Sequence, residues 1–238
     1  MSRILLIGTV HRDPRGLRKL VVTLEEFRPN ILTLEFSHYG LHYRQAHKQA
    51  LRRKLLAGLT NALGSDILTQ SRLKKLLLSS GIGGVAALLN LPFEYKGARY
   101  YSKRYRAPLF SLDVSSYSRE LLKHADDILS PTNLQRLLEF QATPLQALVT
   151  NEYSSAKRLL SLSDGDMTPW PHPSAGNRYW QQRDRIMAMR ITKILHQYPD
   201  RSLAHIGGWH HILPQPDSLF HRLKPWQPIR VLLGHGAL

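Results

Sequence analysis

The chain has 238 residues, no cysteine and a formal net charge of +16. This length suits one domain, residues 1–238, that buries a substantial core. The absence of cysteine excludes disulfide bonds and thiolate ligands, so any metal must be held by imidazole and carboxylate groups, and a reducing, cytoplasmic setting is favoured. The apolar run at residues 4–8 is too short for a secretory signal peptide.

Apolar periodicity predicts strands and helices in alternation. A strand at 3–11, a helix after Asp13-Pro14 and a strand at 31–35 form a βαβ unit, which implies parallel strands. Further strands are predicted at 108–113, 202–211 and 229–235, and helices at 94–106, 118–123, 131–140, 144–162 and 178–197. The proline-rich segment 163–177 is predicted to be a loop over the site. We therefore expect an α/β fold with a central parallel or mixed sheet of about five strands flanked by helices.

The segment 38–97 interrupts this alternation with helical patterns, and we expect a basic helical insertion after the second strand. From Leu41 to Arg106 there are thirteen Lys or Arg residues against Asp66 and Glu94. Such a patch attracts nucleic acid, anionic lipid or an acidic ligand, but it contains no nucleic-acid-binding motif, so a solvated basic face is favoured over a nucleic-acid site. A nucleic-acid partner is not excluded by the charge.

An uncharged stretch, Leu76 to Phe93, raises the question of a membrane span. Three glycines, three polar residues and a proline favour buried helical segments instead. If these segments have a function, we expect them to form an apolar wall of a substrate pocket. We expect no transmembrane span.

Each of the five predicted strands ends on a side chain that binds metals or moves protons. Because ligands gather beyond the carboxyl ends of strands in open α/β sheets, these side chains are candidates for one site; they are His11, Glu35, Asp113, His210, His211 and His235. In Gly8-Thr9-Val10-His11 and Gly207-Gly208-Trp209-His210, a glycine turn delivers a histidine three residues later. Two such imidazoles with Glu35 make a set that suits Zn²⁺, Mn²⁺, Co²⁺ or Fe²⁺ with an open position.

Several motifs occur in this order along the chain: GTVH, LEFS, a helix that starts with a glutamate before LDV, RDRIMAMRI and IGGWHH. Through these motifs the chain resembles the TraB/PrgY/TIKI family, which is related to erythromycin-esterase-like and haem-binding ChaN-like proteins. The resemblance spans nearly the whole chain. It implies an α/β fold and a metal-dependent peptidase activity that favours Mn²⁺ or Co²⁺.

The family pattern also implies which residues form the site. Its two G-x-x-H histidines correspond to His11 and His210, its second-strand glutamate to Glu35, and its helix Arg-Asp pair to Arg183 and Asp184. Glu94 and Asp113 match positions ahead of and at the end of the third strand. The sequence departs from the family pattern at two places. Gln182 replaces a glutamate before Arg-Asp. His211 is an alternative to His210, because G-x-x-H spacing from Gly208 leads to His211 just as spacing from Gly207 leads to His210.

Several roles stay open for these residues. Glu35 is either a ligand or the general base that deprotonates metal-bound water. Arg183 either stabilises an oxyanion or pairs with Glu35 or Asp184. Asp113 either orients a histidine or caps the next helix.

Two functions follow from these observations. The first is a metal-dependent hydrolase, peptidase-like, with a His/His/Glu site, acting on a peptide or another amide-like substrate. The alternative is a protein on the same fold that binds haem or another small anionic ligand without hydrolysis. A homodimer is compatible with either function. For His38, His42, His47 and His235, exposed positions outside the site are favoured.

Overall fold

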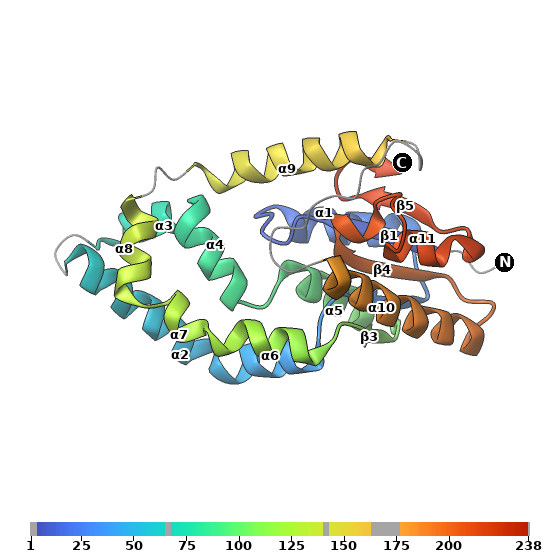
Figure 1. The fold of residues 1–238 in the computed structure, drawn as a ribbon, viewed down its shortest axis with the longest axis horizontal. Coiled ribbons are helices and arrows are strands. Elements are labelled where there is room, and N and C mark those ends of the chain that lie inside the picture. Colours follow the sequence, from blue (N-terminus) through green and yellow to red (C-terminus); the bar gives the residue numbers. More distant parts are fainter. Residues whose placement is uncertain (1–3, 65–67, 140–142, 163–176, 238) are drawn as a thin grey trace.

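The computed structural model describes residues 4–64, 68–139, 143–162 and 177–237. These segments form an α/β fold with five parallel strands and one short antiparallel strand (Figure 1). The strands are β1 (Ile4–Thr9), β2 (Ile31–Leu34), β3 (Leu109–Ser111), β4 (Leu203–Gly208), β5 (Ile229–Leu232) and β6 (Gly236–Ala237). The predicted fold class is therefore confirmed.

The strand order in the sheet is β3-β2-β4-β1-β5-β6. β4 lies between β1 and β2, with Leu203 aligned to both Ile4 and Ile31. The carboxyl ends of β1, β2 and β4 are therefore neighbours, about 4.8 Å apart from strand to strand. This edge of the sheet brings together the chain segments that follow three separate strands.

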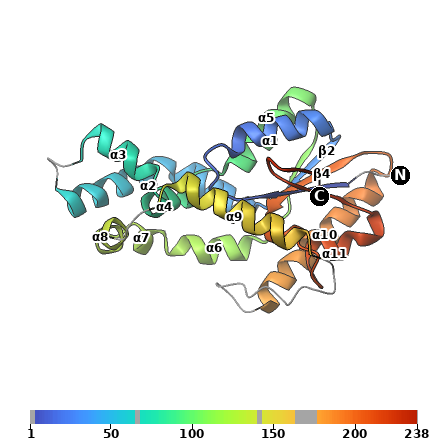
Figure 2. The same ribbon diagram turned by 90° about the horizontal axis from the view of Figure 1, so that it is seen from above.

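Helices cover both faces of the sheet (Figure 2). α1 (Gly16–Phe27) and α5 (Phe93–Tyr105) lie on one face, and α10 (Asn177–Gln197) and α11 (Leu219–Leu223) on the other. α1 buries Leu20 and Leu24, which are one helical turn apart, and it ends at Arg28 in the left-handed conformation, φ 51°, just before Pro29. All residues of β1, β2 and β4 are buried, as expected for parallel strands that are covered on both sides.

The remaining helices extend beyond the carboxyl ends of the strands (Figure 1). We call this part the helical lobe; it contains α2 (His38–Leu63), α3 (Gln70–Leu77), α4 (Ser80–Leu89), α6 (Ser115–Lys123), α7 (Ala125–Ile128) and α8 (Pro131–Glu139). α9 (Leu145–Leu160) runs from this lobe back to the sheet. Two short 3₁₀ helices, η2 (Trp209–Ile212) and η3 (Lys224–Trp226), follow β4 and α11.

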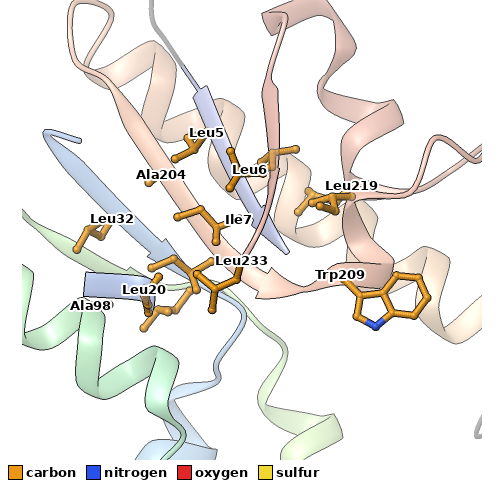
Figure 3. Close-up of a cluster of buried hydrophobic side chains, with 14 of the residues drawn as sticks. Leu5, Leu6, Ile7, Leu20, Leu32, Ala98, Ala204, Trp209, Leu219 and Leu233 are labelled. Carbon is orange, nitrogen blue, oxygen red and sulfur yellow. The ribbon is translucent and has the colours of Figure 1, made fainter. Parts of the chain in front are cut away.

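Two clusters of buried apolar side chains hold these parts together. The larger one surrounds the sheet and includes Leu6, Ile7 and Leu32 from the strands with Leu20 from α1 and Ala98 from α5 (Figure 3). The smaller one lies in the helical lobe and is made by residues such as Leu51, Leu59, Ile82, Leu129 and Leu134. Each part of the molecule therefore has its own apolar core.

The helical lobe does not consist of the same helices as the predicted insertion 38–97. α5 packs beside α1 on the sheet, whereas α7 and α8, which come after β3, complete the core of the lobe. The apolar stretch Leu76 to Phe93 forms the end of α3, all of α4 and the start of α5. No helix within the described residues is long and apolar enough to cross a membrane. The predicted loop 163–177 lies outside the described residues, apart from Asn177.

Candidate functional site

His11 lies just beyond the end of β1, and Glu94 holds its imidazole at Nδ1. Nδ1 lies 2.9 Å from Oε1 of Glu94, a residue at the start of α5 that is 5% exposed. Thr9 donates a hydrogen bond of 2.8 Å to the same oxygen. The side chain of His11 is 56% exposed, so the ring remains accessible at its Nε2 side. The sequence therefore places an oriented, accessible imidazole at this edge of the sheet.

Glu35 follows β2 and is the centre of a buried polar network. Its Oε1 accepts a hydrogen bond of 2.7 Å from Nη2 of Arg183 and lies 2.9 Å from Nε2 of His211. Its Oε2 accepts a hydrogen bond of 2.6 Å from the backbone N–H of Gly208. Nε2 of His11 lies 3.8 Å from this second oxygen. Both oxygens of the carboxylate are therefore engaged.

Arg183, on α10, joins Glu35 to the end of β3. Its Nε and Nη2 donate to the two oxygens of Asp113 at 2.9 and 2.8 Å, the bidentate geometry that a guanidinium and a carboxylate favour. The rings of Tyr117 and Trp180 each lie 4.5 Å from the guanidinium carbon. Asp113 therefore neither orients a histidine nor caps a helix through its side chain within the described contacts; it pairs with Arg183.

Among the described contacts, His211 is the histidine of η2 that joins this network. η2 turns the chain directly after β4, which buries His211 between Glu35 and Asp184, whereas His210 is only partly buried and its ring stacks on Trp209. Asp184 also accepts a hydrogen bond of 3.0 Å from the backbone N–H of Leu219. The preference for His210 from G-x-x-H spacing is thus not met by the contacts, and the alternative, His211, is the residue beside Glu35.

The network shifts the ionisation of its members strongly. Burial alone lowers the pKa of His211, but the charges of Asp184 and Glu35 and the hydrogen bonds to them raise it to about 10. Burial disfavours the charged form of Glu35, yet His211 and Arg183 hold its pKa well below the usual range. At neutral pH we therefore describe this cluster as an imidazolium and a guanidinium that share three carboxylates.

His11 has a different electrostatic environment. Partial desolvation by the groups around the ring lowers its pKa, while the hydrogen bond to Glu94 and the negative charge of Glu94 raise it, with a smaller contribution from Glu35, to about 9. Oε2 of Glu94 is buried and has no hydrogen-bond partner among the described residues. The charge of Glu94 is therefore directed mainly at His11.

A cavity of about 370 Å³ opens beside His11. Its floor contains His11, Glu35, Glu94 and Arg183, and its other side is formed by the helical lobe. α4 contributes Gly84, Ala87 and Leu88, and α6 contributes Tyr117, Ser118 and Leu121. Part of the stretch Leu76 to Phe93 therefore does line a pocket, as its apolar character had suggested.

The glycines at the strand ends serve close packing. None of Gly8, Gly207 and Gly208 has a positive φ. A Cβ on Gly8 would lie 2.9 Å from the backbone of Trp209, so glycine lets η2 approach β1. A Cβ on Gly207 would lie 2.9 Å from Oε2 of Glu35 and 3.1 Å from Nε2 of His205. Glycine is therefore needed at these positions for close packing, and not for the sharp turn that the sequence pattern predicted.

The donors do not form the predicted metal site. Within residues 4–64, 68–139, 143–162 and 177–237, no three His, Asp or Glu side chains are grouped so as to hold an ion. A cation at Glu35 would have to replace Arg183 or His211 at one oxygen, or the Gly208 N–H at the other. The geometry does not fit a His₂-carboxylate site, and metal binding stays a prediction.

Sequence reasoning missed several contributors to the site. Tyr117 and Trp180 contact Arg183 from α6 and α10, and His205, on β4, is buried with the pKa of its ring lowered by burial and by the charge of His211 to about 3. Helix and strand periodicity mark such residues only as apolar or polar, so neither pattern predicts which groups these side chains contact. The four histidines expected outside the site, His38, His42, His47 and His235, are exposed.

Comparison with known proteins adds no relative: no family model, no curated protein and no solved structure matches the chain.

Proposed function

We propose that this protein is a hydrolase that cleaves an ester or amide bond, with His11 as the general base. The observation that carries the proposal is the His11–Glu94 pair at the wall of the cavity: Nδ1 is fixed by a buried carboxylate, and Nε2 lies on the accessible side of the ring, where it accepts a proton in the neutral form, a fraction that grows as pH approaches the pKa of about 9. A carboxylate that orients an imidazole in this way is the arrangement that serves general-base catalysis in many hydrolases. The motifs that resemble the TraB/PrgY/TIKI family support the same class of reaction.

The chemical step needs only a substrate carbonyl and a water molecule beside His11. Nε2 of neutral His11 takes a proton from the water, the hydroxide oxygen bonds to the carbonyl carbon, and the leaving group departs with a proton returned by His11. Glu94 stabilises the imidazolium that forms between the two transfers. Glu35 and Arg183 act as positioning residues, because they hold the ends of β2, β3 and β4 against one another.

The substrate must place its carbonyl in a cavity that is partly apolar. Val10, Phe36 and Leu88 are among its lining residues, and a volume of about 370 Å³ suits a small acyl or short peptide group. We therefore propose small esters and short peptides or other amides as the substrate classes.

A panel of p-nitrophenyl esters and short peptide anilides tests this proposal. Wild-type protein should hydrolyse at least one member, and His11→Ala should abolish the reaction, whereas the matched variant His42→Ala, an exposed histidine on α2, should retain it. The assays should be run with and without EDTA. Hydrolysis that survives EDTA supports catalysis by the groups of the chain; hydrolysis that is lost and then restored by Mn²⁺ or Co²⁺ supports the metal-dependent mechanism instead. Turnover that persists in His11→Ala contradicts the proposal.

A further inference from the structure

Arg44 is a buried arginine in the helical lobe. It lies on α2 seven residues before Leu51 and eleven before Leu55, so it shares the buried stripe of that helix. Only 7% of the residue is exposed. Arginine is rarely buried to this extent without a carboxylate partner, because its charge loses the solvation of water.

The contacts of Arg44 are made with neutral groups. Nε donates 3.0 Å to the carbonyl oxygen of Leu88, Nη1 donates 3.2 Å to that of Gly40, and the guanidinium lies 5.4 Å from the ring of Phe36. Among the described residues Arg44 has no carboxylate partner, and its Nη2 makes no hydrogen bond with them. Burial lowers its pKa to about 10, which leaves it charged at neutral pH.

Arg44 lines the same cavity as His11, and Ser118 lies beside it. Both residues belong to the cavity wall. A Cβ on Gly40 would lie 3.0 Å from Nη1 of Arg44 and 3.0 Å from Oγ of Ser118, so both side chains lie close to Gly40. Ser37 donates a hydrogen bond of 2.6 Å to Ser118 Oγ, which leaves the hydroxyl proton of Ser118 available as a donor.

The other charged groups of the cavity wall are already paired. Glu35 and Asp113 pair with Arg183, and Glu94 pairs with His11. Arg12 likewise pairs with Glu152 at 3.1 Å. Arg44 is thus the charged side chain of this wall whose counter-ion the described part of the chain does not supply.

We propose that Arg44 and Ser118 form a subsite for a carboxylate group of the ligand that occupies this cavity. A carboxylate would accept hydrogen bonds from Nη2 and from the Ser118 hydroxyl and would neutralise the buried guanidinium. A monoanion fits better than a dianionic phosphate, because only one guanidinium nitrogen is open and carboxylates line the rest of the cavity. Resting on the hydrolase proposed above, this inference specifies its substrate as an ester or amide that carries a carboxylate away from the bond that is cleaved.

Binding of simple probes tests the subsite without any need for turnover. Hexanoate should raise the melting temperature of the protein and bind measurably by calorimetry, whereas 1-hexanol, of the same chain length, should bind at least about tenfold more weakly, as should inorganic phosphate. Arg44→Gln should weaken hexanoate about tenfold to a hundredfold, the range for loss of hydrogen bonds to a charged group. The matched control is Arg53→Gln, an exposed arginine on the same helix, which should bind hexanoate as the wild type does.

Further variants separate the two proposals and guard against misfolding. His11→Ala should keep hexanoate binding, so loss of hydrolysis and loss of the subsite are distinguished. If Arg44→Gln fails to fold, Arg44→Lys, which keeps the charge without the planar fork, should bind hexanoate with intermediate affinity. In the hydrolysis assay, Arg44→Gln should lower kcat/KM for p-nitrophenyl hemiglutarate but not for p-nitrophenyl pentanoate. Equal binding of hexanoate and 1-hexanol by the wild type, tighter binding of phosphate, or undiminished hexanoate binding in a folded Arg44 variant would overturn the inference.

Discussion

The pairing of His11 with Glu94 predicts an unusually basic histidine that one substitution should return to the ordinary range. The pKa of His11 is raised from 6.5 to about 9, with Glu94 as the principal cause of the rise against the opposing effect of burial. In Glu94→Gln the hydrogen bond becomes neutral and the charge disappears, so the pKa should fall by about two units or more. At pH 7 the neutral form of the ring should then increase from about 1% to more than half.

Histidine NMR measures this shift without a substrate. The ring signal of His11, assigned by its loss in His11→Ala, should titrate near pH 9 in the wild type and near or below pH 6.5 in Glu94→Gln. The matched control is Glu152→Gln, another carboxylate of the cavity wall that pairs with Arg12 and Trp209 and not with His11. In a hydrolysis assay the rising limb of the pH profile of kcat/KM should move in the same direction. A His11 titration that is the same in wild type and Glu94→Gln would refute the reasoning.

Four further predictions concern the buried network. Asp113→Ala should lower the free energy of unfolding by about 1.5 to 3 kcal/mol, because Arg183 loses its bidentate hydrogen bonds to Asp113 while it keeps Glu35 as a counter-ion; a change below about 1 kcal/mol in urea unfolding would contradict this. Because the folded-state pKa of His211, about 10, lies above the unfolded value of 6.5, its stabilising contribution is complete below about pH 6.5 and should be lost as pH rises toward 10, a decline that urea titrations should show to be smaller in His211→Asn. Gly207→Ala should lower stability by about 1 to 3 kcal/mol, since its Cβ would lie 2.9 Å from Oε2 of Glu35, and a melting temperature equal to that of the wild type would show that the carboxylate moves aside. Mn²⁺, Co²⁺ or Zn²⁺ added to EDTA-treated protein should leave the melting temperature unchanged at neutral pH, because both oxygens of Glu35 are already engaged, and a rise of several degrees would restore the metal-binding prediction.

The sequence was sufficient to predict which strand ends meet at the candidate site. Apolar runs locate the strands, and the rule that parallel strands present their carboxyl ends at one edge predicts that the residues after them meet. His11 and Glu35 follow β1 and β2 directly, so their approach follows from topology once β4 takes its place between these strands. The same reasoning failed to choose between His210 and His211, because the choice depends on how η2 rotates the chain after Gly208.

The chemistry of the site was harder to predict than its place. Histidines and a carboxylate at strand ends suit a metal. In the structure, however, Arg183, on a helix about 150 residues further along the chain, donates a hydrogen bond to the Glu35 oxygen that a metal would need. No local pattern encodes which carboxylates a helical arginine will reach. Arg44 is the contrasting case: its place on the buried stripe of α2 is visible in the sequence, since it lies one heptad before Leu51, and that position is the signal that would have identified it.

The distribution of charge along the cavity suggests how a substrate would be oriented. At the end of the cavity near the sheet, the three carboxylates of Glu35, Asp113 and Asp184 face the two cations Arg183 and His211, which leaves an excess of one negative charge. On the side of the cavity formed by α2 and α4 of the helical lobe, Arg44 leaves an excess of one positive charge. A carboxylate therefore gains energy at the lobe end and loses it near the sheet, in a cavity where partial exclusion of water strengthens both effects. Because His11 lies on the sheet side, the proposed anionic substrate should bind with its carboxylate on the lobe side and its scissile carbonyl beside the imidazole, and the same charges should disfavour the opposite orientation.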